Sequence, residues 1–219
     1  MKRAHYFLTL ILSFICIFGA SAQDHSIRFQ NGTLTVSPLQ DNAVRIRYIE
    51  GEAAELPEWL YVENDDEVSC KKSSKGDITT FRLKGLTLTA DNGSGRIEVA
   101  DSRGVKVFSA LAHELKDGTI QGEPTKEAKL VIDSPADEYL YGLGQFQDGY
   151  LNVRGLTRRL TQVNTQISVP FMLSSKGYGL LWNNYGLTDF NPAESSVKME
   201  RAEAKGEEVT LNVTSTEGN

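Results

Sequence analysis

The sequence predicts an all-β protein built as a β-sandwich with mostly antiparallel strands. Short runs of alternating apolar and polar residues recur along the chain, and turn residues bound most of them. No segment keeps a helical period over three turns, and only residues 111–116 and 201–208 could each give about one helical turn. The spacing of the runs, without an internal repeat or a low-complexity linker, favours one sandwich domain over residues 23–219.

The strands are expected where apolar residues alternate. In chain order these runs are 27–29, 34–36, 44–48, 86–88, 97–99, 105–107 and 211–213. Asn31-Gly32 separates the first two and predicts a hairpin, because both residue types tolerate positive φ. Residues 91–95 and 101–104 are rich in Asp, Asn, Ser and Gly, so 86–108 is expected to form a three-stranded meander. The acidic, irregular segment 50–66 is expected to be a surface loop.

Residues 1–22 predict an export signal. Lys2 and Arg3 precede a 14-residue apolar run from Tyr6 to Gly19, and Ala20-Ser21-Ala22 offers a cleavage site. A membrane-spanning helix needs about 20 apolar residues. We therefore expect a cleaved protein exported to the periplasm or the cell exterior, with no membrane association after cleavage. A retained membrane anchor is the alternative.

Charge and residue types narrow the function. Removing Lys2 and Arg3 with the signal changes the net charge from −6 to −8, and no basic stripe follows, which argues against a nucleic-acid partner. After cleavage Cys70 would be the single cysteine, so no intrachain disulfide is expected. His25 and His113 are far apart in sequence, and no dinucleotide fingerprint or nucleophile elbow occurs. No metal and no cofactor are expected.

The stretch from Tyr139 to Phe190 has the composition of a sugar-binding surface. It holds nine of the fifteen aromatic residues that follow the signal, seven glycines and eight Asn or Gln, but only Asp148 and Asp189 as acids. Aromatic faces stack on sugar rings, and amides both donate to and accept from hydroxyls. This composition favours a neutral, polyhydroxylated ligand. Core aromatics and turn glycines would give the same composition.

The acids of this region do not form a recognisable catalytic pair. Asp148 lies in a glycine-rich loop and is the best candidate to accept a hydrogen bond from a sugar hydroxyl. Asp137 and Glu138 precede a strand and are interpreted as turn acids. Nothing in the sequence raises the pKa of one carboxyl while keeping a partner ionised, so a complete glycosidase site is not visible.

The same stretch resembles glycoside hydrolase family 31. The matching segments are Glu138-Tyr139-Leu140-Tyr141-Gly142-Leu143-Gly144-Gln145, Asn152, Arg154-Gly155, Asn164, Pro170-Phe171, Lys176-Gly177-Tyr178-Gly179 and Trp182-Asn183-Asn184. Gln145-Phe146-Gln147-Asp148 looks most like the α-xylosidase-type branch. The resemblance implies a galactose-mutarotase-like sandwich that precedes a catalytic (β/α)8 barrel, on which the catalytic aspartates lie. The barrel would follow residue 219, so the chain alone is expected to be inactive and its sandwich incomplete at the C-terminal end.

The resemblance implies a contributory role for a polar loop that borders the sugar site of an α-linked oligosaccharide. Its candidate substrate contacts are Gln145, Gln147, Asp148, Asn152 and Asn164, while Tyr141, Phe171, Tyr178 and Trp182 are expected to pack first. Family members often carry an acid shortly after the Asn164 position, where this chain has Thr165-Gln166. The alternative is a free-standing carbohydrate-binding module. A mutarotase-like epimerase would need a His and a carboxylate, and only His113 lies near enough.

Overall fold

The computed structural model describes residues 24–52, 60, 68–191, 197–201 and 211–215. The described chain contains strands, turns and no helix, and the paired strands run antiparallel. The predicted all-β class is therefore confirmed, as is a β-sandwich of the galactose-mutarotase-like kind. The chain divides into two compact units, residues 1–95 with 101–104 and residues 96–100 with 105–219. The extent of one domain over 23–219 stays a prediction, and the export signal lies outside the described residues.

The first unit consists of two antiparallel groups of three strands. The strands are β1 (His25–Phe29), β2 (Gly32–Gln40), β3 (Ala43–Ile49), β4 (Lys71–Lys75), β5 (Ile78–Arg82) and β6 (Leu86–Asp91). β2 pairs with both β1 and β3, and β5 pairs with both β4 and β6. Leu34 and Val36 of β2 and Phe81 of β5 are fully buried or nearly so. His25 lies against Phe81 with ring centroids 6.1 Å apart, so apolar faces from both groups meet in this unit.

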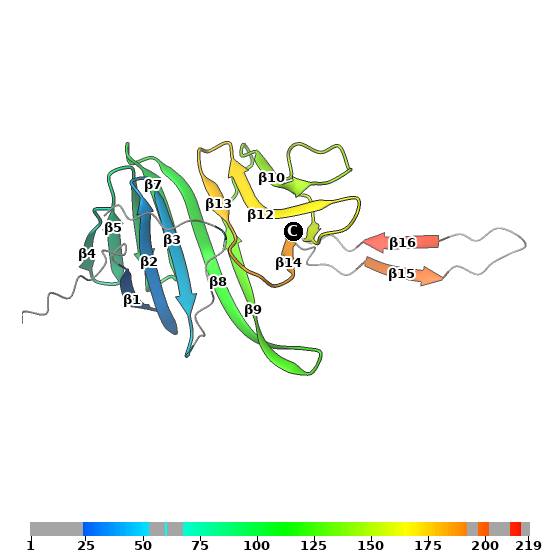
Figure 1. Ribbon diagram of the computed structural model, residues 1–219, viewed down its shortest axis with the longest axis horizontal. Helices are drawn as coiled ribbons and strands as arrows, with labels where there is room; N and C mark the ends of the chain where they lie inside the picture. The colour runs from blue at the N-terminus through cyan, green and yellow to red at the C-terminus, as the bar shows by residue number, and fades with distance from the viewer. Residues whose placement is uncertain (1–23, 53–59, 61–67, 192–196, 202–210, 216–219) are drawn as a thin grey trace, which may run out of the picture. The chain divides into compact units, whose positions relative to one another are not determined.

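The second unit contains the remaining strands (Figure 1). They are β7 (Arg96–Asp101), β8 (Lys106–Ile120), β9 (Glu123–Ile132), β10 (Leu140–Gln145), β11 (Arg158–Leu160), β12 (Ile167–Ser174), β13 (Gly179–Leu181), β14 (Thr188–Phe190), β15 (Val197–Arg201) and β16 (Leu211–Ser215). β12 lies between β10 and β13 in a three-stranded sheet, and β11 pairs with β14. A core of Leu140, Leu143, Val153 and Met172 joins β10 and β12 to the loop between them.

The first hairpin is shifted by one residue from its prediction. Phe29 pairs with Gly32, so Gln30 and Asn31 form the two-residue loop and Gly32 opens β2. Gln30 takes the positive φ of 51°. Gly32 is required for another reason: a Cβ there would collide with the Ile49 carbonyl oxygen on β3. Gly32 is therefore required for close packing of β2 against β3, and not for the conformation of the turn.

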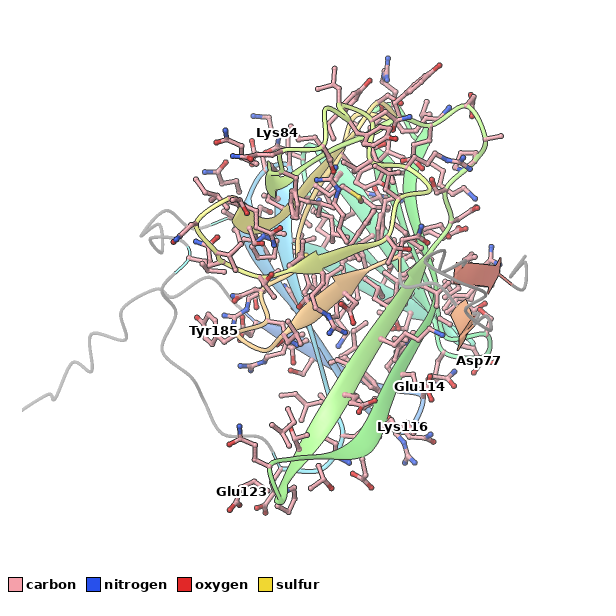
Figure 2. All side chains as sticks on the ribbon, turned by 90° about the vertical axis from the view of Figure 1, so that its right-hand side faces the viewer. Asp77, Lys84, Glu114, Lys116, Glu123 and Tyr185 are labelled. Carbon is pink, nitrogen blue, oxygen red and sulfur yellow. The ribbon has the colours of Figure 1, made fainter. Side chains whose placement is uncertain are left out.

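The predicted helical turn at 111–116 is wrong. These residues belong to β8, which pairs with β9 in a long ribbon, with Glu114 and Lys116 along its side and Glu123 at its tip (Figure 2). Leu111, His113 and Leu115 are half-buried while the residues between them are exposed, which is the period of a strand. Of the other suggested turn, 201–208, only Arg201 is described, and it ends strand β15 (Val197–Arg201). Most of the 50–66 loop lies outside the described residues. The three strands and both turns predicted for 86–108 are present.

Candidate functional site

A β-bulge in β10 forms the base of the candidate loop. Gly142, Leu143 and Gly144 all have positive φ, at 103°, 67° and 104°, and the register with β12 shifts between the two glycines. A Cβ at Gly142 would lie 2.6 Å from the Phe171 carbonyl oxygen, and a Cβ at Gly144 would collide with that of Ile167. The bulge also brings Leu143 into the same core as Leu140, although strict alternation would put them on opposite faces. The Gly-x-Gly pattern is therefore structural.

The chain leaves β10 at Gln145 and returns to the start of the same strand. The Asn152 side-chain oxygen accepts hydrogen bonds from the backbone N–H groups of Leu140 and Arg154, at 3.0 and 3.1 Å. The Val153 N–H donates to the Leu140 carbonyl oxygen at 2.8 Å, and the Val153 side chain is 2% exposed. These bonds close the loop 146–151 at its base. Asn152, predicted to contact sugar, has its amide oxygen occupied in this closure.

A buried arginine holds the outgoing half of the loop. Arg158, at the start of β11, donates from a terminal guanidinium nitrogen to Asp148 Oδ2 at 2.6 Å. Its guanidinium lies 4.2 Å from the centre of the Phe146 ring. Asp148 Oδ1 accepts from the Tyr150 N–H at 3.2 Å, so both carboxylate oxygens of Asp148 bind within the loop. Sequence reasoning missed Arg158, since nothing distinguishes it from the neighbouring Arg159 before the fold is known.

The remaining candidate residues face solvent. Gln145, Gln147 and Asn164 are exposed, and their side chains make no hydrogen bond to another residue in the described ranges. Asn164 lies in the turn closed by the Val163–Gln166 bridge. β12 begins directly after this turn, and its first residue, Ile167, pairs with Gln145. The turn and the loop therefore leave the sheet at the same end. Asn152 lies beside Leu140 at the other end of β10. The usual rise per residue of a strand puts that end about 15 Å from Gln145.

The exposed tip of the loop adds an aromatic residue that the prediction did not include. Tyr150 is 63% exposed two residues after Asp148, whose carboxylate holds its backbone. A tyrosine presented in this way combines an aromatic face with a hydroxyl. Of the predicted packing aromatics, Tyr178 packs on the core and meets Phe108 edge-on at 5.3 Å, whereas Phe171 is 37% exposed.

The two acids before β10 have different roles. Asp137 is exposed and pairs with Lys176 at 2.6 Å; this lysine holds the pKa of the Asp137 carboxyl below its usual range. Glu138 closes a turn, because its N–H donates to the Pro135 carbonyl oxygen at 2.9 Å. Its side chain is nevertheless 2% exposed and accepts a hydrogen bond from the Ser174 hydroxyl, which the interpretation as a turn acid did not include. The pKa of the Tyr178 phenol is raised, mainly by burial and further by the nearby Glu138 carboxyl. The Glu138 carboxyl therefore holds the end of β12 through Ser174, and its burial keeps it away from a ligand in solvent.

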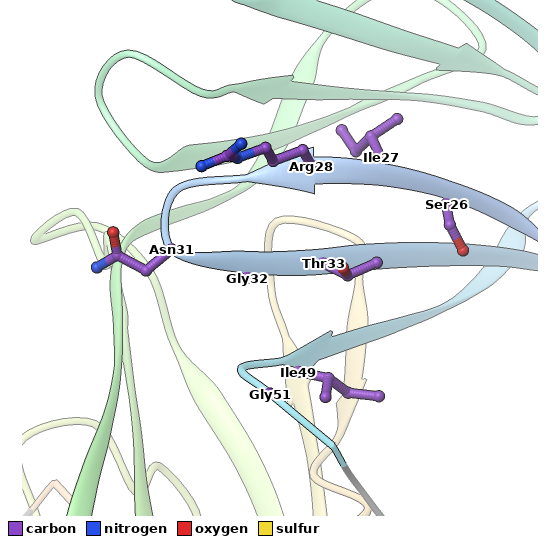
Figure 3. A pocket seen from close by; sticks show the side chains of 8 residues that line it. All are labelled: Ser26, Ile27, Arg28, Asn31, Gly32, Thr33, Ile49 and Gly51. Carbon is purple, nitrogen blue, oxygen red and sulfur yellow. The ribbon is translucent and has the colours of Figure 1, made fainter.

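An open hollow of about 460 Å³ lies on the first unit, beside the β1–β2 turn, with Arg28, Asn31 and Thr33 among the lining residues (Figure 3). It shares no residue with the predicted site. No three His, Cys, Asp or Glu side chains in the described ranges gather as a metal site would require, and no helix there is long and apolar enough to cross a membrane.

This fold, with its polar loop on a bulged strand, is that of a known domain class. The family model of the glycosyl hydrolase 31 N-terminal galactose mutarotase-like domain matches residues 33–191. The chain belongs to this family, which confirms the resemblance drawn from the motifs between Glu138 and Asn184.

The chain is similar to part of two longer proteins from different organisms. The alpha-xylosidase of Saccharolobus solfataricus is 30% identical over 184 residues, which cover 79% of this chain and 25% of that protein. A family 31 glucosidase of Pseudescherichia vulneris is 28% identical over 179 residues, covering 72% of this chain and 34% of that protein. The chain thus spans a quarter to a third of the length of these two relatives.

Solved structures share the fold. The family 31 alpha-xylosidase of Xanthomonas citri superposes with a TM-score of 0.72 at 24% identity, over 81% of this chain and 20% of that one. An alpha-xylosidase from a soil metagenome, complexed with xylose, gives a TM-score of 0.66 at 27% identity, over 77% of this chain and 28% of that one.

Proposed function

We propose that this chain is the N-terminal domain of an exported α-glycoside hydrolase of the α-xylosidase type, and that its loop 145–164 borders the sugar-binding site. In the full-length enzyme a catalytic barrel domain would hydrolyse the O-glycosyl bond of an α-linked oligosaccharide. The chain by itself would not cleave the substrate. Family membership and the names of the relatives support the class of enzyme.

The observation that carries the role of the loop is its fixed, uncharged tip. Gln147 and Tyr150 are exposed on either side of Asp148, whose carboxylate is bound by Arg158. The ion pair neutralises the acid and orders the backbone, so the tip offers an amide and an aromatic face without free charge. A neutral sugar is bound by such groups. Ordering before binding also lowers the entropic cost of the contact.

The loop residues are best tested by kinetics of the full-length protein that contains this chain. Tyr150→Ala and Gln147→Ala should raise KM for an aryl α-xyloside about three- to tenfold while kcat changes less than about twofold, because these side chains would add uniform binding. Tyr139→Ala is the matched control, since Tyr139 is 54% exposed at the opposite end of β10. An unchanged KM in both loop variants would contradict the role of the loop.

The alternative is a free-standing carbohydrate-binding module that uses the same loop. Titration calorimetry of the 219-residue chain with xylo- and gluco-oligosaccharides separates the two functions. Heat at micromolar sugar that disappears in Tyr150→Ala, with no catalytic domain in the natural product, would favour the module. Mass spectrometry of that product also tests export, since a mature N-terminus at Gln23 is expected.

A further inference from the structure

The outer side of the sheet formed by β1, β2 and β3 is basic. Phe29, Leu34 and Val36 of these strands are buried, so the residues that alternate with them point to the other side of the sheet. The three strands contain no Asp or Glu, although the whole chain has a net charge of −6. We call the outward-pointing residues the arginine face; they are Ser26, Arg28, Thr33, Thr35, Ser37, Arg45, Arg47 and Ile49.

Strand pairing arranges these side chains in rows. Arg28 lies opposite Thr33, and in the next row Thr35 lies between Ser26 and Arg47. The Thr35 side chain is covered and shares a hydrogen bond of 2.9 Å with the Ser26 hydroxyl, whereas Ser26, Arg28 and Thr33 are exposed. The usual strand spacing and rise put the Cα atoms of Arg28 and Arg47 about 12 Å apart. Two cations at that separation suit successive charges on a polymer better than one small anion.

Two of these arginines have no acid in contact. Arg28 and Arg47 form no hydrogen bond or ion pair with another residue in the ranges that the structure describes. An arginine elsewhere on the first unit is paired: the Arg103 guanidinium lies 2.7 Å from Asp101. The fork of N–H donors on Arg28 and on Arg47 is therefore available to a ligand that brings its own negative charge.

The open hollow on the first unit lies on this face. Ser26, Arg28 and Thr33 line it together with Ile49 (Figure 3). Its volume of about 460 Å³ is within the range of about 300–1,000 Å³ that small-ligand sites occupy. Lys72 of β4 adds a cation beside it, since its ammonium donates to the Ser26 carbonyl oxygen at 3.1 Å. The hollow thus offers a guanidinium, two hydroxyls and an aliphatic side chain to one ligand unit.

We propose that the arginine face binds an acidic polysaccharide, with uronate carboxylates paired to Arg28 and Arg47. Arginine holds a carboxylate through two parallel N–H···O bonds, and the hydroxyls of the face exchange hydrogen bonds with sugar hydroxyls. No residue of the face is aromatic, so it lacks the stacking platform of a single-stranded nucleic-acid site. The hollow shares no residue with the loop 145–164, for which a neutral sugar is proposed. The face would hold the protein on a polymer and take no part in cleavage.

Titration calorimetry of the full-length protein that contains this chain tests the site, with polygalacturonate as the probe. Arg28→Gln/Arg47→Gln should raise Kd at least about tenfold, because two charge-assisted contacts are lost. Lys71→Gln/Arg82→Gln is the matched control, which changes the net charge equally. Lys71 and Arg82 are paired and exposed on β4 and β5, and they point away from the core because the neighbouring Phe81 is buried. The control should keep Kd within about twofold of wild type.

A change in the ligand tests the charge itself. Methyl-esterified polygalacturonate keeps the sugar chain but has no carboxylate charge, so it should not bind measurably. Added salt should weaken binding of the unesterified polymer, because exposed charges are screened. Equal binding of both forms would overturn the role of the carboxylates. Tighter binding of dextran sulfate or of single-stranded DNA would overturn the assignment of a uronate polymer.

The site itself is rejected by either of two results. Wild-type protein that does not bind polygalacturonate would reject it, and so would equal losses in the two double variants, since these would show a general effect of net charge. Circular dichroism checks that both double variants fold. Arg28→Gln alone replaces one exposed side chain, and it should still raise Kd about threefold.

Discussion

The ion pair between Arg158 and Asp148 allows a quantitative prediction because its two partners are buried to different degrees. The Arg158 side chain is 6% exposed and the Asp148 side chain 38%. Removing the carboxylate leaves a buried cation without its partner, whereas removing the arginine leaves an acid that water can reach. We expect Asp148→Ala to lower the free energy of unfolding by about 2–3 kcal/mol. Arg158→Met should lower it by about 1–2 kcal/mol, which includes the lost contact with Phe146.

Urea unfolding of the 219-residue chain at neutral pH, followed by circular dichroism, measures these losses. The double variant should lose less than the sum of the two single losses, since it contains no unpaired charge. Asp117→Ala is the control: Asp117 is 88% exposed, pairs with Lys126 on the ribbon, and its removal should change little. If Asp148→Ala behaved like this control, or cost less than Arg158→Met, the proposed clamp on the loop would be refuted.

Three further expectations concern other parts of the chain. In urea unfolding, Gly144→Ala should lower the free energy of unfolding by about 3 kcal/mol or more, because the new Cβ would collide with β12. Gly149→Ala is the control: Gly149 has a φ of +76° and lies in open space, so its substitution should cost only about 1 kcal/mol. Arg159 holds the pKa of the Asp189 carboxyl below its usual range. The stability from this pair is therefore present above about pH 4 and is lost as the pH falls through the lowered pKa. The difference in Tm between wild type and Asp189→Asn should shrink on acidification, and a constant difference would contradict this. Burial raises the pKa of the Cys70 thiol, so iodoacetamide should modify it more slowly than a cysteine peptide at about pH 8.

The strands of the first unit were predictable where one face is buried. Phe29, Leu34 and Val36 lie on inward faces, so their alternation with polar residues is visible in the sequence. β4, Lys71–Lys75, could not be found in this way, because all five of its residues are exposed and it contains no apolar residue. Its conformation comes from backbone pairing with β5, which the sequence pattern does not record.

The candidate site shows a similar division. Composition correctly marked the loop as polar and rich in turns, but an asparagine that binds a sugar and one that binds a backbone have the same chemistry. Asn152 accepts from Leu140 and Arg154, and this becomes visible only once the loop is closed. The buried Glu138 and Arg158 were missed for a related reason: each is an ordinary charged residue in the sequence, and its burial depends on residues far along the chain.

The closure of the loop at Asn152 has a consequence for how related chains can diverge. Both ends of the segment 146–151 are fixed at β10, by the sheet at Gln145 and by the bonds to Leu140. The entropic cost of a longer loop grows slowly, at about 0.6 kcal/mol for each doubling of its length. Insertions at the tip can therefore accumulate without disturbing the strand or its core. The fold therefore lets the reach of this segment change by insertion or deletion at its tip while the pairing of β10 with β12 is kept.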